Sequence, residues 1–478
     1  MALCYHSRVK LIPFSIFLLL ISNVVVQAQS QSLNPTETKI VQAIDADKQP
    51  PVDLLRQLVE INSGTKNLEG VRAVGKVLMP QFEALGFKVR WAPMDEVNRA
   101  GTLVAQRPCS NPGKCGKRVL LIGHMDTVFE KESPFQHFTM LGPSQDPDRS
   151  SGGDGAPHSE TKAGSWASGP GTDDMKGGLV VMLTALKALK ASGALEHADI
   201  KVVLSGDEEA AGHPLEIARR DMIEAAKNSD AGLEFENTAR RDGVYYGSTS
   251  RRGSMTWRVT ATGETGHSAG VFGPNMGYGA IYELTRVLDA FRTQLPEEYL
   301  TYNVGLVLGG TTAQTNPQET GGEATGKPNI VAPTAIAVGD LRCLSGEQVE
   351  RVQGKMRAIA GQHLAKTDAK IEFYEAYPPQ APTEGNKALL KLLNQVNDSL
   401  GQPDMPELDP MKRGAGDSAF IAQYIPTLAG VGSSGSGDHS GAEKIDLSSI
   451  PINTKRAAVL IYRLSQLPSE GKLVDLVK

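Results

Sequence analysis

The chain has 478 residues, a net charge of −5, 40% hydrophobic residues and 22% charged residues. It is longer than the size at which a single hydrophobic core stops growing, so we expect two domains. The mild acidity and the lack of a basic cluster argue against a nucleic-acid-binding protein.

The N-terminus differs from the rest of the chain. A short basic lead with Arg8 and Lys10 precedes an apolar run at 11–21, and a small-residue cleavage motif ends at Ala28. This pattern is typical of a secretory signal peptide over residues 1–28. A membrane anchor is the alternative, but it needs about 20 clean apolar residues, and polar residues at 22–23 interrupt the run. We therefore expect an exported protein, secreted or periplasmic, that is free of the membrane after cleavage.

Cysteine usage agrees with export. After removal of the signal peptide three cysteines stay: Cys109, Cys115 and Cys343. The first two flank a turn-forming linker between two predicted strands, so a disulfide at the tip of a hairpin is expected in an oxidising compartment. A loop that short would stabilise the fold by roughly 2 kcal/mol. The alternative, a cysteine–metal site, lacks a second cysteine pair, and Cys343 is expected to be a buried free thiol.

The first part of the mature chain alternates helices and strands. A polar leader at 36–49 comes first. Helices are predicted at 51–60 and 71–85, and strands at 88–91, 102–106 and 118–122. The alternation indicates an α/β sheet. The last of these strands leads directly into the sequence GHMDT at 123–127, which contains His124 and Asp126.

Further polar motifs follow. The segment 141–169 is rich in Ser, Gly and Asp, so we interpret it as a surface insertion and His158 as solvated. The sequence GPGTDDMKGG at 169–178 then precedes an apolar helix at 179–191. A phosphate-binding loop is excluded because the Walker pattern is absent and two carboxylates occupy the turn.

Two more predicted strands also end in acidic residues. The strand at 200–204 leads into SGDEE, which contains Glu208 and Glu209. The strand at 231–236 alternates, so Glu234 and Glu236 share one face and only one of them needs to be a ligand.

A second unit interrupts this pattern at 247–377. Its predicted order is β-α-β-β-α-β, with strands at 253–262, 302–308, 335–341 and 370–374 and helices at 276–293 and 345–364. This order describes a compact two-layer α+β domain. The α/β character then returns with helices at 386–400 and 453–467 and two loops, at 413–418 and 432–441.

Two imidazoles and four carboxylates follow apolar runs or stand where loops meet predicted elements: His124, Asp174, Glu208, Glu209, Glu236 and His439. Open α/β sheets bind ligands at strand ends. Imidazole and carboxylate ligands without thiolates suit a pair of hydrolytic zinc ions, with other divalent metals as alternatives. Such a centre needs a bridging carboxylate and a base that is not a ligand.

These motifs resemble those of the zinc exopeptidases and deacylases that include glutamate carboxypeptidase, acetylornithine deacetylase and succinyl-diaminopimelate desuccinylase, with glutamate carboxypeptidase the most similar. The matching sequences, in order along nearly the whole mature chain, are GHMDTVF, GPGTDDMKGG, GDEEAAG, LEFE, GETGHSAG and GDHSG. The resemblance implies an α/β fold. In it a mixed-sheet catalytic domain in two parts, 29–246 and 378–478, is interrupted by a smaller α+β lid and dimerisation domain at 247–377.

The resemblance also implies roles for single residues. The two metal ions would be held by His124, Asp174, Glu209, Glu236 and His439, with Asp174 as the bridge. Glu208 would be the general base, and Asp126 would orient His124. Asp173 and Glu234 would stay outside the metal shells.

Within the lid, His267 would stabilise the oxyanion, often in the active site of a partner subunit. Asn329, Arg342 and the turn at 432–437 would hold the carboxylate of the substrate. A surface ion pair is the alternative role for Arg342.

The expected function is that of an exported co-catalytic zinc metallopeptidase of the carboxypeptidase type. It would hydrolyse an amide next to a free carboxylate in a small peptide or acylated amino acid, and it would form a homodimer through the lid. One alternative is an N-acyl amino acid deacylase with the same dinuclear site, and another is an inactive relative that binds peptides or metal. Two departures leave a preference for C-terminal glutamate open: the last lid strand is followed by Glu375-Ala376-Tyr377 instead of an arginine, and 414–418 is a variant of Gly-Gly-Thr-Asp.

Overall fold

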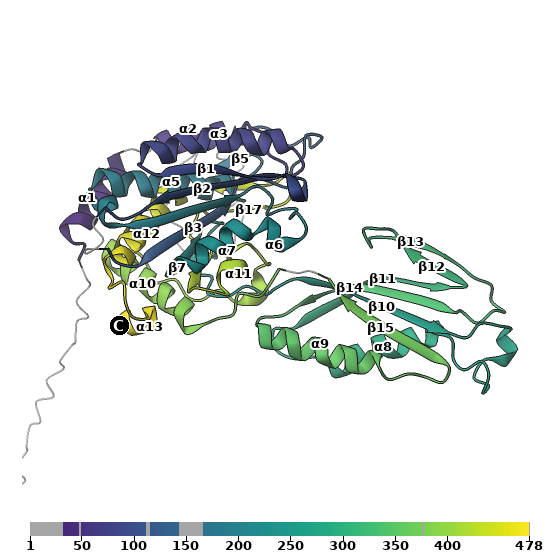
Figure 1. Ribbon diagram of the computed structural model, residues 1–478. Helices are drawn as coiled ribbons and strands as arrows, with labels where there is room; N and C mark the ends of the chain where they lie inside the picture. The colour runs from purple at the N-terminus through teal and green to yellow at the C-terminus, as the bar shows by residue number, and fades with distance from the viewer. Residues whose placement is uncertain (1–31, 47–48, 111–114, 143–165, 375–376, 478) are drawn as a thin grey trace, which may run out of the picture.

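The computed structural model describes residues 32–46, 49–110, 115–142, 166–374 and 377–477. They form two bodies that lie side by side, one around a six-stranded sheet and one around a four-stranded sheet, each with its own hydrophobic core (Figure 1). The predicted signal peptide and His158 lie outside the described residues. Within the described part of the chain, no helix has the length and apolarity needed to span a bilayer.

The larger sheet is mixed and has the strand order β1-β2-β6-β3-β7-β16. Its strands are β1 (Lys88–Met94), β2 (Arg99–Arg107), β3 (Arg118–His124), β6 (Asp199–Ser205), β7 (Ala231–Glu234) and β16 (Thr427–Leu428). The four strands β6, β3, β7 and β16 run parallel, whereas β2 is antiparallel to both of its neighbours. The predicted mixed α/β sheet is therefore confirmed.

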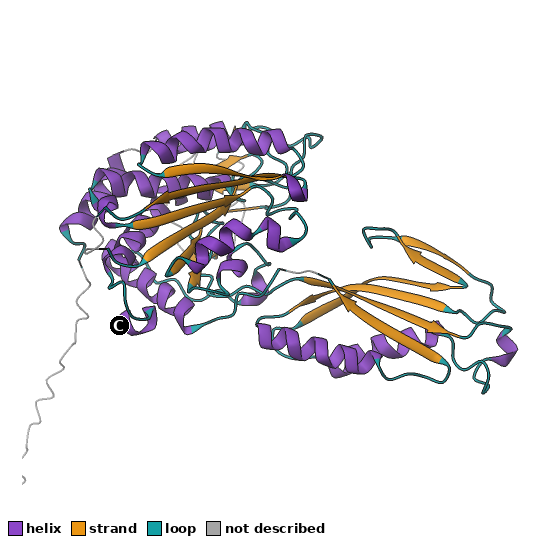
Figure 2. Cartoon of the chain, viewed as in Figure 1, coloured by secondary structure: helices purple, strands orange, loops and turns teal. Residues whose placement is uncertain are grey.

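Helices cover both faces of this sheet (Figure 2). On one face lie α1 (Pro35–Ala46), α2 (Gln49–Val59), α3 (Leu68–Ala84), α5 (Lys176–Ala191), α10 (Glu384–Leu400) and α12 (Ser449–Gln466), and on the other lie α7 (Arg220–Lys227) and α11 (Ser418–Ile421). Short helices α6 (Leu215–Ala218) and α13 (Leu473–Leu476) complete this body. Successive side chains of β3 point to opposite faces of the sheet, so both faces carry apolar groups for helices to cover. Leu121 packs in the core on the first face, while Leu120 and Ile122 pack in the core on the second.

Helix α1 corrects one expectation. The segment predicted as a polar leader is a helix that packs on α5 and α12. Only Ile40 and Ile44 supply its buried apolar side chains, so the apolar stripe is narrow. An ion pair compensates: Arg463 Nε of α12 donates to the carboxylate of buried Glu37 at 2.8 Å.

Short strands join the two chain halves of this body. They form a sheet in the order β17-β18-β5-β4, with β4 (Thr139–Met140), β5 (Trp166–Ser168), β17 (Gly435–Ser436) and β18 (Lys444–Asp446), and a hairpin of β8 (Arg240–Arg241) and β9 (Val244–Tyr245). The end of the predicted surface insertion is therefore a strand, and Trp166 and Ala167 in it are buried. Residues 143–165 of that insertion lie outside the described part.

The second body follows the predicted order of elements. Its elements are β10 (Met255–Gly263), α8 (Ala280–Gln294), β11 (Thr301–Gly310), β14 (Thr334–Arg342), α9 (Gly346–Ala360) and β15 (Thr367–Phe373). The antiparallel sheet has the order β11-β14-β10-β15, and both helices pack against its same face (Figure 2). Trp257 is fully buried there against Phe291, with ring centroids 5.7 Å apart.

A further hairpin, β12 (Thr312–Thr315) and β13 (Gly322–Thr325), was not predicted from the sequence. Its residues are mostly exposed, so they lack the apolar alternation that marks a strand. The two connections to the larger body pair with each other through isolated bridges, Ser254 with Tyr377 and Arg251 with Gln380. All strands of the second sheet fall within the predicted segment 247–377, while the domain limits themselves stay a prediction.

The cysteines adopt the expected states. Cys109 and Cys115 are joined by a disulfide. Cys343 is a buried free thiol in the core of the second body, and burial raises its pKa to about 12.

Candidate metal centre

Three neighbouring parallel strands carry the predicted site residues to one edge of the larger sheet. Strand β3 ends at His124, β6 ends just before Glu208 and Glu209, and β7 ends just before Glu236. Because parallel strands have their carboxyl ends at the same edge, residues about 110 positions apart in sequence meet there. Asp174 enters from the turn before α5, and His439 enters from the segment between β17 and β18.

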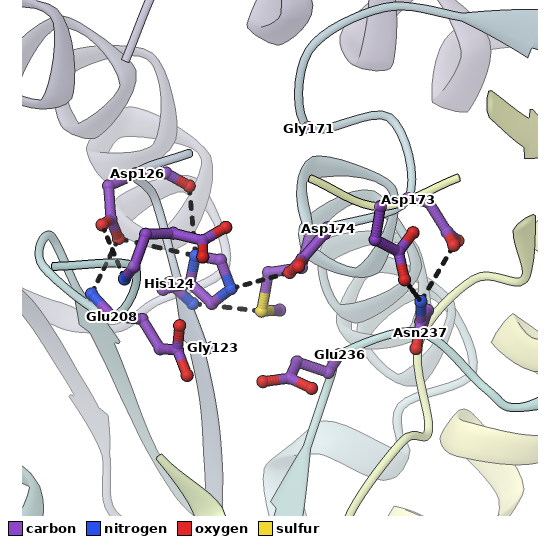
Figure 3. Close-up of polar contacts among 12 residues, drawn as sticks. Gly123, His124, Asp126, Gly171, Asp173, Asp174, Glu208, Glu236 and Asn237 are labelled. Carbon is purple, nitrogen blue, oxygen red and sulfur yellow. Dashed lines mark hydrogen bonds and ion pairs between the residues drawn. The ribbon is translucent and has the colours of Figure 1, made fainter. Parts of the chain in front are cut away.

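The carboxylate of Asp174 lies between the two imidazoles. Its Oδ1 is 3.1 Å from His124 Nε2 (Figure 3). Its Oδ2 is 3.1 Å from His439 Nε2. His439 Nε2 is also 3.1 Å from Glu209 Oε2. Ligand atoms of His124, Asp174 and Glu209 all lie within 4.8 Å of one another. This is the arrangement expected of a carboxylate that bridges two metal ions.

The electrostatics of these groups are strongly coupled. Burial alone would lower the pKa of His124, but hydrogen bonds to Asp126 and Asp174 and the nearby carboxylates raise it well above its usual value. Hydrogen bonds to Asp174 and Glu209 raise the pKa of His439 to about 11. Burial would raise the pKa of Asp174, yet the two imidazoles hold it well below its usual range. The imidazoles thus carry the positive charge that this cluster of carboxylates requires, and bound cations would displace their protons.

The donor set fits divalent metal ions. It contains only imidazole nitrogens and carboxylate oxygens, which suit zinc and related ions. The buried Oε1 of Glu209 has no hydrogen-bond partner within the described part of the chain, although burial of an unpaired carboxylate oxygen is costly. His439 adopts a left-handed backbone with φ of 60°, a conformation that is sparsely populated and concentrated at functional sites.

Asp126 contacts three parts of the centre. Its carboxylate accepts the backbone N–H of Glu208 at 3.0 Å and of Glu209 at 3.1 Å, and it accepts the hydroxyl of Thr65 at 2.6 Å. His124 Nδ1 lies 3.1 Å from the backbone oxygen of Asp126 and 3.5 Å from its carboxylate. One fully buried carboxylate therefore fixes the imidazole and the two-glutamate segment together.

The turn that carries Asp174 is held by Glu443, a residue that sequence reasoning missed. The buried Glu443 carboxylate accepts three backbone N–H groups, from Gly171 at 3.1 Å, Asp173 at 2.9 Å and Asp174 at 3.0 Å. The adjoining Gly178 packs so closely on the end of β7 that an added Cβ would lie 1.7 Å from the backbone oxygen of Phe235. The sequence marks Glu443 only by its position, as an acidic residue four positions after His439.

Replacing Glu443 by Gln is expected to loosen this turn. The amide offers one acceptor oxygen and turns an N–H₂ group toward the backbone donors, so at least one buried N–H loses its partner, at a cost of about 1–3 kcal/mol. Both the thermal unfolding midpoint and the metal affinity should fall, measured by calorimetry and by titration with a chelator. The exchange Glu470→Gln on the exposed C-terminal loop serves as the control, and an unchanged metal affinity in Glu443→Gln would contradict the role.

Asp173 lies beside Asp174 but points away from the centre. Asn237 Nδ2 donates to both Asp173 Oδ2 and Asp438 Oδ2 at 2.9 Å (Figure 3). Burial and the neighbouring Asp438 raise the pKa of Asp173 well above its usual value. Asn237 thus holds Asp173 away from the two imidazoles, and its place outside the metal shells stays a prediction.

Glu208 lines a cleft of about 400 Å³ that also exposes Asp174, Glu236 and His439. Burial raises the pKa of the Glu208 carboxyl well above its usual value. Its backbone oxygen accepts the hydroxyl of Tyr377 at 3.1 Å, and Tyr377 in turn accepts from Arg219. Glu208 is thus fixed through its backbone while its carboxylate faces the cleft.

Glu236 and Glu234 share one arginine. Arg251 Nη1 donates to Glu234 Oε2 at 2.6 Å and to Glu236 Oε2 at 2.8 Å. Glu234 also accepts the backbone N–H of Ser418, which directs it into the protein, while Glu236 lines the cleft. Arg413 Nη2 donates to Glu236 Oε2 at 3.0 Å. The two arginines hold the pKa of Glu236 below its usual value although burial acts in the opposite direction.

The predicted lid residues do not line this cleft. His267 and Asn329 are exposed near the far end of the second body, where the backbone oxygen of Asn329 accepts from Ser268. Arg342 Nε donates to Asp340 at 2.8 Å, with both side chains more than a third exposed. The structure thus brings together the predicted metal ligands, Glu208 and Asp126, but not His267, Asn329 or Arg342.

A carboxylate shared by two imidazoles at the edge of an α/β sheet is the geometry of a metal site, and sequence comparison gives the family. The chain belongs to Peptidase family M20/M25/M40, whose model matches residues 120–463. The resemblance stated from the motifs is therefore confirmed.

Relatives in this family include peptidases and deacylases. The chain is 29% identical over 431 residues to carboxypeptidase G2 from Pseudomonas sp. (strain RS-16), covering 87% of this chain and 90% of that protein. It is 26% identical over 438 residues to a succinyl-diaminopimelate desuccinylase from Acidiphilium cryptum (strain JF-5), covering 89% and 98%.

Solved structures share the fold. A tripeptidase from Staphylococcus aureus has a TM-score of 0.64 at 19% identity and covers 88% of this chain and 99% of its own. A dinuclear metal-binding peptidase of the M20 family from Bacillus subtilis has a TM-score of 0.57 at 13% identity and covers 88% and 99%. The protein is a metal-dependent hydrolase of a family of metallopeptidases, carboxypeptidases and deacylases.

Proposed function

We propose that the protein is an exported carboxypeptidase that uses two zinc ions to hydrolyse an amide next to a free carboxylate and releases an amino acid, C-terminal glutamate being one candidate. The observation that carries this proposal is the Asp174 carboxylate shared between His124 and His439 in a cleft that also holds Glu208. The similarity to carboxypeptidase G2 over most of both chains supports the choice of reaction.

The bound ions would supply Lewis acidity and an activated water. His124, Asp174, Glu209, Glu236 and His439 would hold them. Glu208 lines the cleft and is not needed as a ligand, so it would take the proton from the attacking water and deliver it to the leaving amine. Asp126 would hold the imidazole of His124 and the backbone of Glu208 in fixed positions relative to each other through the contacts described above.

Lid residues enter this proposal through a second subunit. His267 is exposed on the lid and absent from the cleft of its own chain, which is what a residue that serves a partner's active site requires. Strand β11 lies at an edge of the lid sheet and exposes Val304 and Val307, which supports a homodimer formed through this domain. Asn329 and Arg342 would then contact substrate only across the dimer or after lid movement. Light scattering on the purified protein measures the oligomeric state.

Export is supported by the N-terminal pattern and by the Cys109–Cys115 disulfide, which suits an oxidising compartment. N-terminal sequencing of the mature protein from its host would then begin at Gln29. A mature protein that begins at Met1 would overturn this part of the proposal.

The reaction itself is tested with zinc-loaded protein and two sets of substrates. One set contains N-blocked dipeptides with free C-termini, and the other contains acetyl and succinyl amino acids. Hydrolysis of the first set, lost on chelation and restored by zinc, supports the carboxypeptidase. Hydrolysis of the second set alone would favour the deacylase, an alternative that the similarity to a desuccinylase keeps in view. Metal binding without hydrolysis of either set would indicate an inactive relative.

A further inference from the structure

Basic side chains line the cleft together with three of the predicted metal ligands, Asp174, Glu236 and His439. Five of its lining residues are basic: Arg240, Arg241, Arg251, Lys412 and Arg413. They come from the hairpin and loop after β7, from the hinge before β10 and from the loop before α11. The carboxylates that line the cleft, Asp174, Glu208, Glu236 and Asp438, almost balance this charge. Two divalent ions would add positive charge to the cleft, and an anionic ligand would offset part of it.

Two of these arginines already use their hydrogen-bond donors in contacts within the protein. Arg251 donates from Nε to the Gly414 oxygen at 2.8 Å and from Nη2 to the Ala415 oxygen at 2.9 Å, and its Nη1 serves Glu234 and Glu236. All three of its nitrogens are used. Arg240 donates to Asp446 at 2.8 Å and stacks over the ring of Tyr245. Both therefore fix the walls of the cleft and are poor candidates for a ligand site.

Arg413 and Lys412 keep donors for a ligand. Arg413 uses only Nη2, which donates to Glu236 at 3.0 Å and to the Asn237 oxygen at 2.9 Å. Its Nε and Nη1 have no hydrogen-bond partner among the described residues, although the side chain is only 11% exposed. The ammonium group of Lys412 is exposed and makes no ion pair within the described part of the chain. Arg251 fixes the backbone that follows Arg413, so this loop is held in place before a ligand arrives.

We propose that Arg413 and Lys412 form a carboxylate-binding subsite that selects amides of acidic amino acids. This inference rests on the proposed function, since it assumes that a released amino acid occupies the cleft. Arg413 contacts Glu236, a predicted metal ligand, so its free nitrogens hold the carboxylate next to the scissile amide. Lys412 stands beside it at the exposed side of the cleft, together with Arg241, and binds the side-chain carboxylate of the same residue.

The test compares two substrates that differ by one carboxylate. N-blocked dipeptides with the same first residue end in Glu or in the isosteric Gln, and kcat and KM are measured for each. The unaltered protein is expected to prefer Glu. Lys412→Glu should lower the Glu/Gln ratio of kcat/KM by about tenfold, mainly through a higher KM for the Glu substrate, because a like charge replaces an attractive one. Lys391→Glu, the same charge change on the exposed face of α10, should leave the ratio unchanged.

Arg413→Met tests the other half of the subsite. It should raise KM for both substrates, because both carry the carboxylate next to the amide, and metal content is measured in parallel because Arg413 touches Glu236. Full metal content with a raised KM supports the inference, as does inhibition by free glutamate that weakens in both variants. An unchanged Glu/Gln ratio in Lys412→Glu, or an unchanged KM in metal-loaded Arg413→Met, would overturn it. If the unaltered protein cleaves neither dipeptide, the proposed function fails instead, so the two failures are distinguishable.

Discussion

Replacing Glu208 by Gln is expected to abolish turnover while both metal ions stay bound. The amide keeps the shape of the side chain but cannot accept a proton, and loss of a general base costs about 10²–10⁴-fold in kcat. The backbone contacts that position this residue, to Asp126 and to Tyr377, do not involve the carboxylate and are retained. Metal analysis and kcat measured on the same preparation check the prediction.

The neighbouring glutamate provides the matched control for that variant. Glu209→Gln makes the identical chemical change one residue away, but Glu209 belongs to the cluster around Asp174. It should therefore lose metal affinity as well as activity. The assignment of the two roles would be wrong if Glu208→Gln released metal, or if it kept near-normal turnover.

The second large effect is expected for Asp174→Asn. The carboxylate faces both imidazoles, so its neutralisation should weaken both metal sites at once. Apart from the loss of activity, the protein should lose the stabilisation that bound metal adds, about 3–4 kcal/mol when free metal exceeds its Kd by a hundred- to a thousandfold. Unfolding with and without zinc measures this difference, which should be large in the unaltered protein and small in the variant.

Asp173→Asn is the control for this variant. Asp173 is also buried, but its surroundings favour the neutral form, and Asn237 holds it away from the imidazoles. An asparagine there should keep both metal ions and leave the zinc-dependent stabilisation intact. Similar losses in the two variants would show that charge in the turn, and not the bridging position of Asp174, supports the centre.

The meeting of the candidate site residues at one sheet edge was predictable from the sequence where polar residues follow strands. His124, Glu208 and Glu236 come directly after apolar runs, and three adjacent parallel strands deliver them to one sheet edge. The family motifs then distinguish Glu208 from Glu209 and Asp174 from Asp173, which spacing alone leaves open. The order of helices and strands could also be predicted from the sequence, because the strands of both sheets have clear apolar patterns.

What the sequence did not reveal depends on contacts between distant segments. Glu443 supports the Asp174 turn from 269 positions away, and nothing in its local sequence marks it as a partner of backbone N–H groups. Which arginine of the cleft keeps free donors also depends on tertiary contacts, because Arg251 uses all its nitrogens in contacts with Glu234, Gly414 and Ala415. Helix α1 was missed because two isoleucines and an ion pair with Arg463 replace the usual apolar stripe.

The division of the larger body between two chain segments has a consequence for biosynthesis. Strand β16, helix α12, His439 and Glu443 all come after the lid, yet they complete the sheet, the core and the metal centre that the first segment begins. A nascent chain that has not emerged up to these residues has neither the second imidazole nor the support of the Asp174 turn. The enzyme therefore cannot become active in stages during translation, and any product truncated before this last segment would be inert toward the substrates of the complete protein.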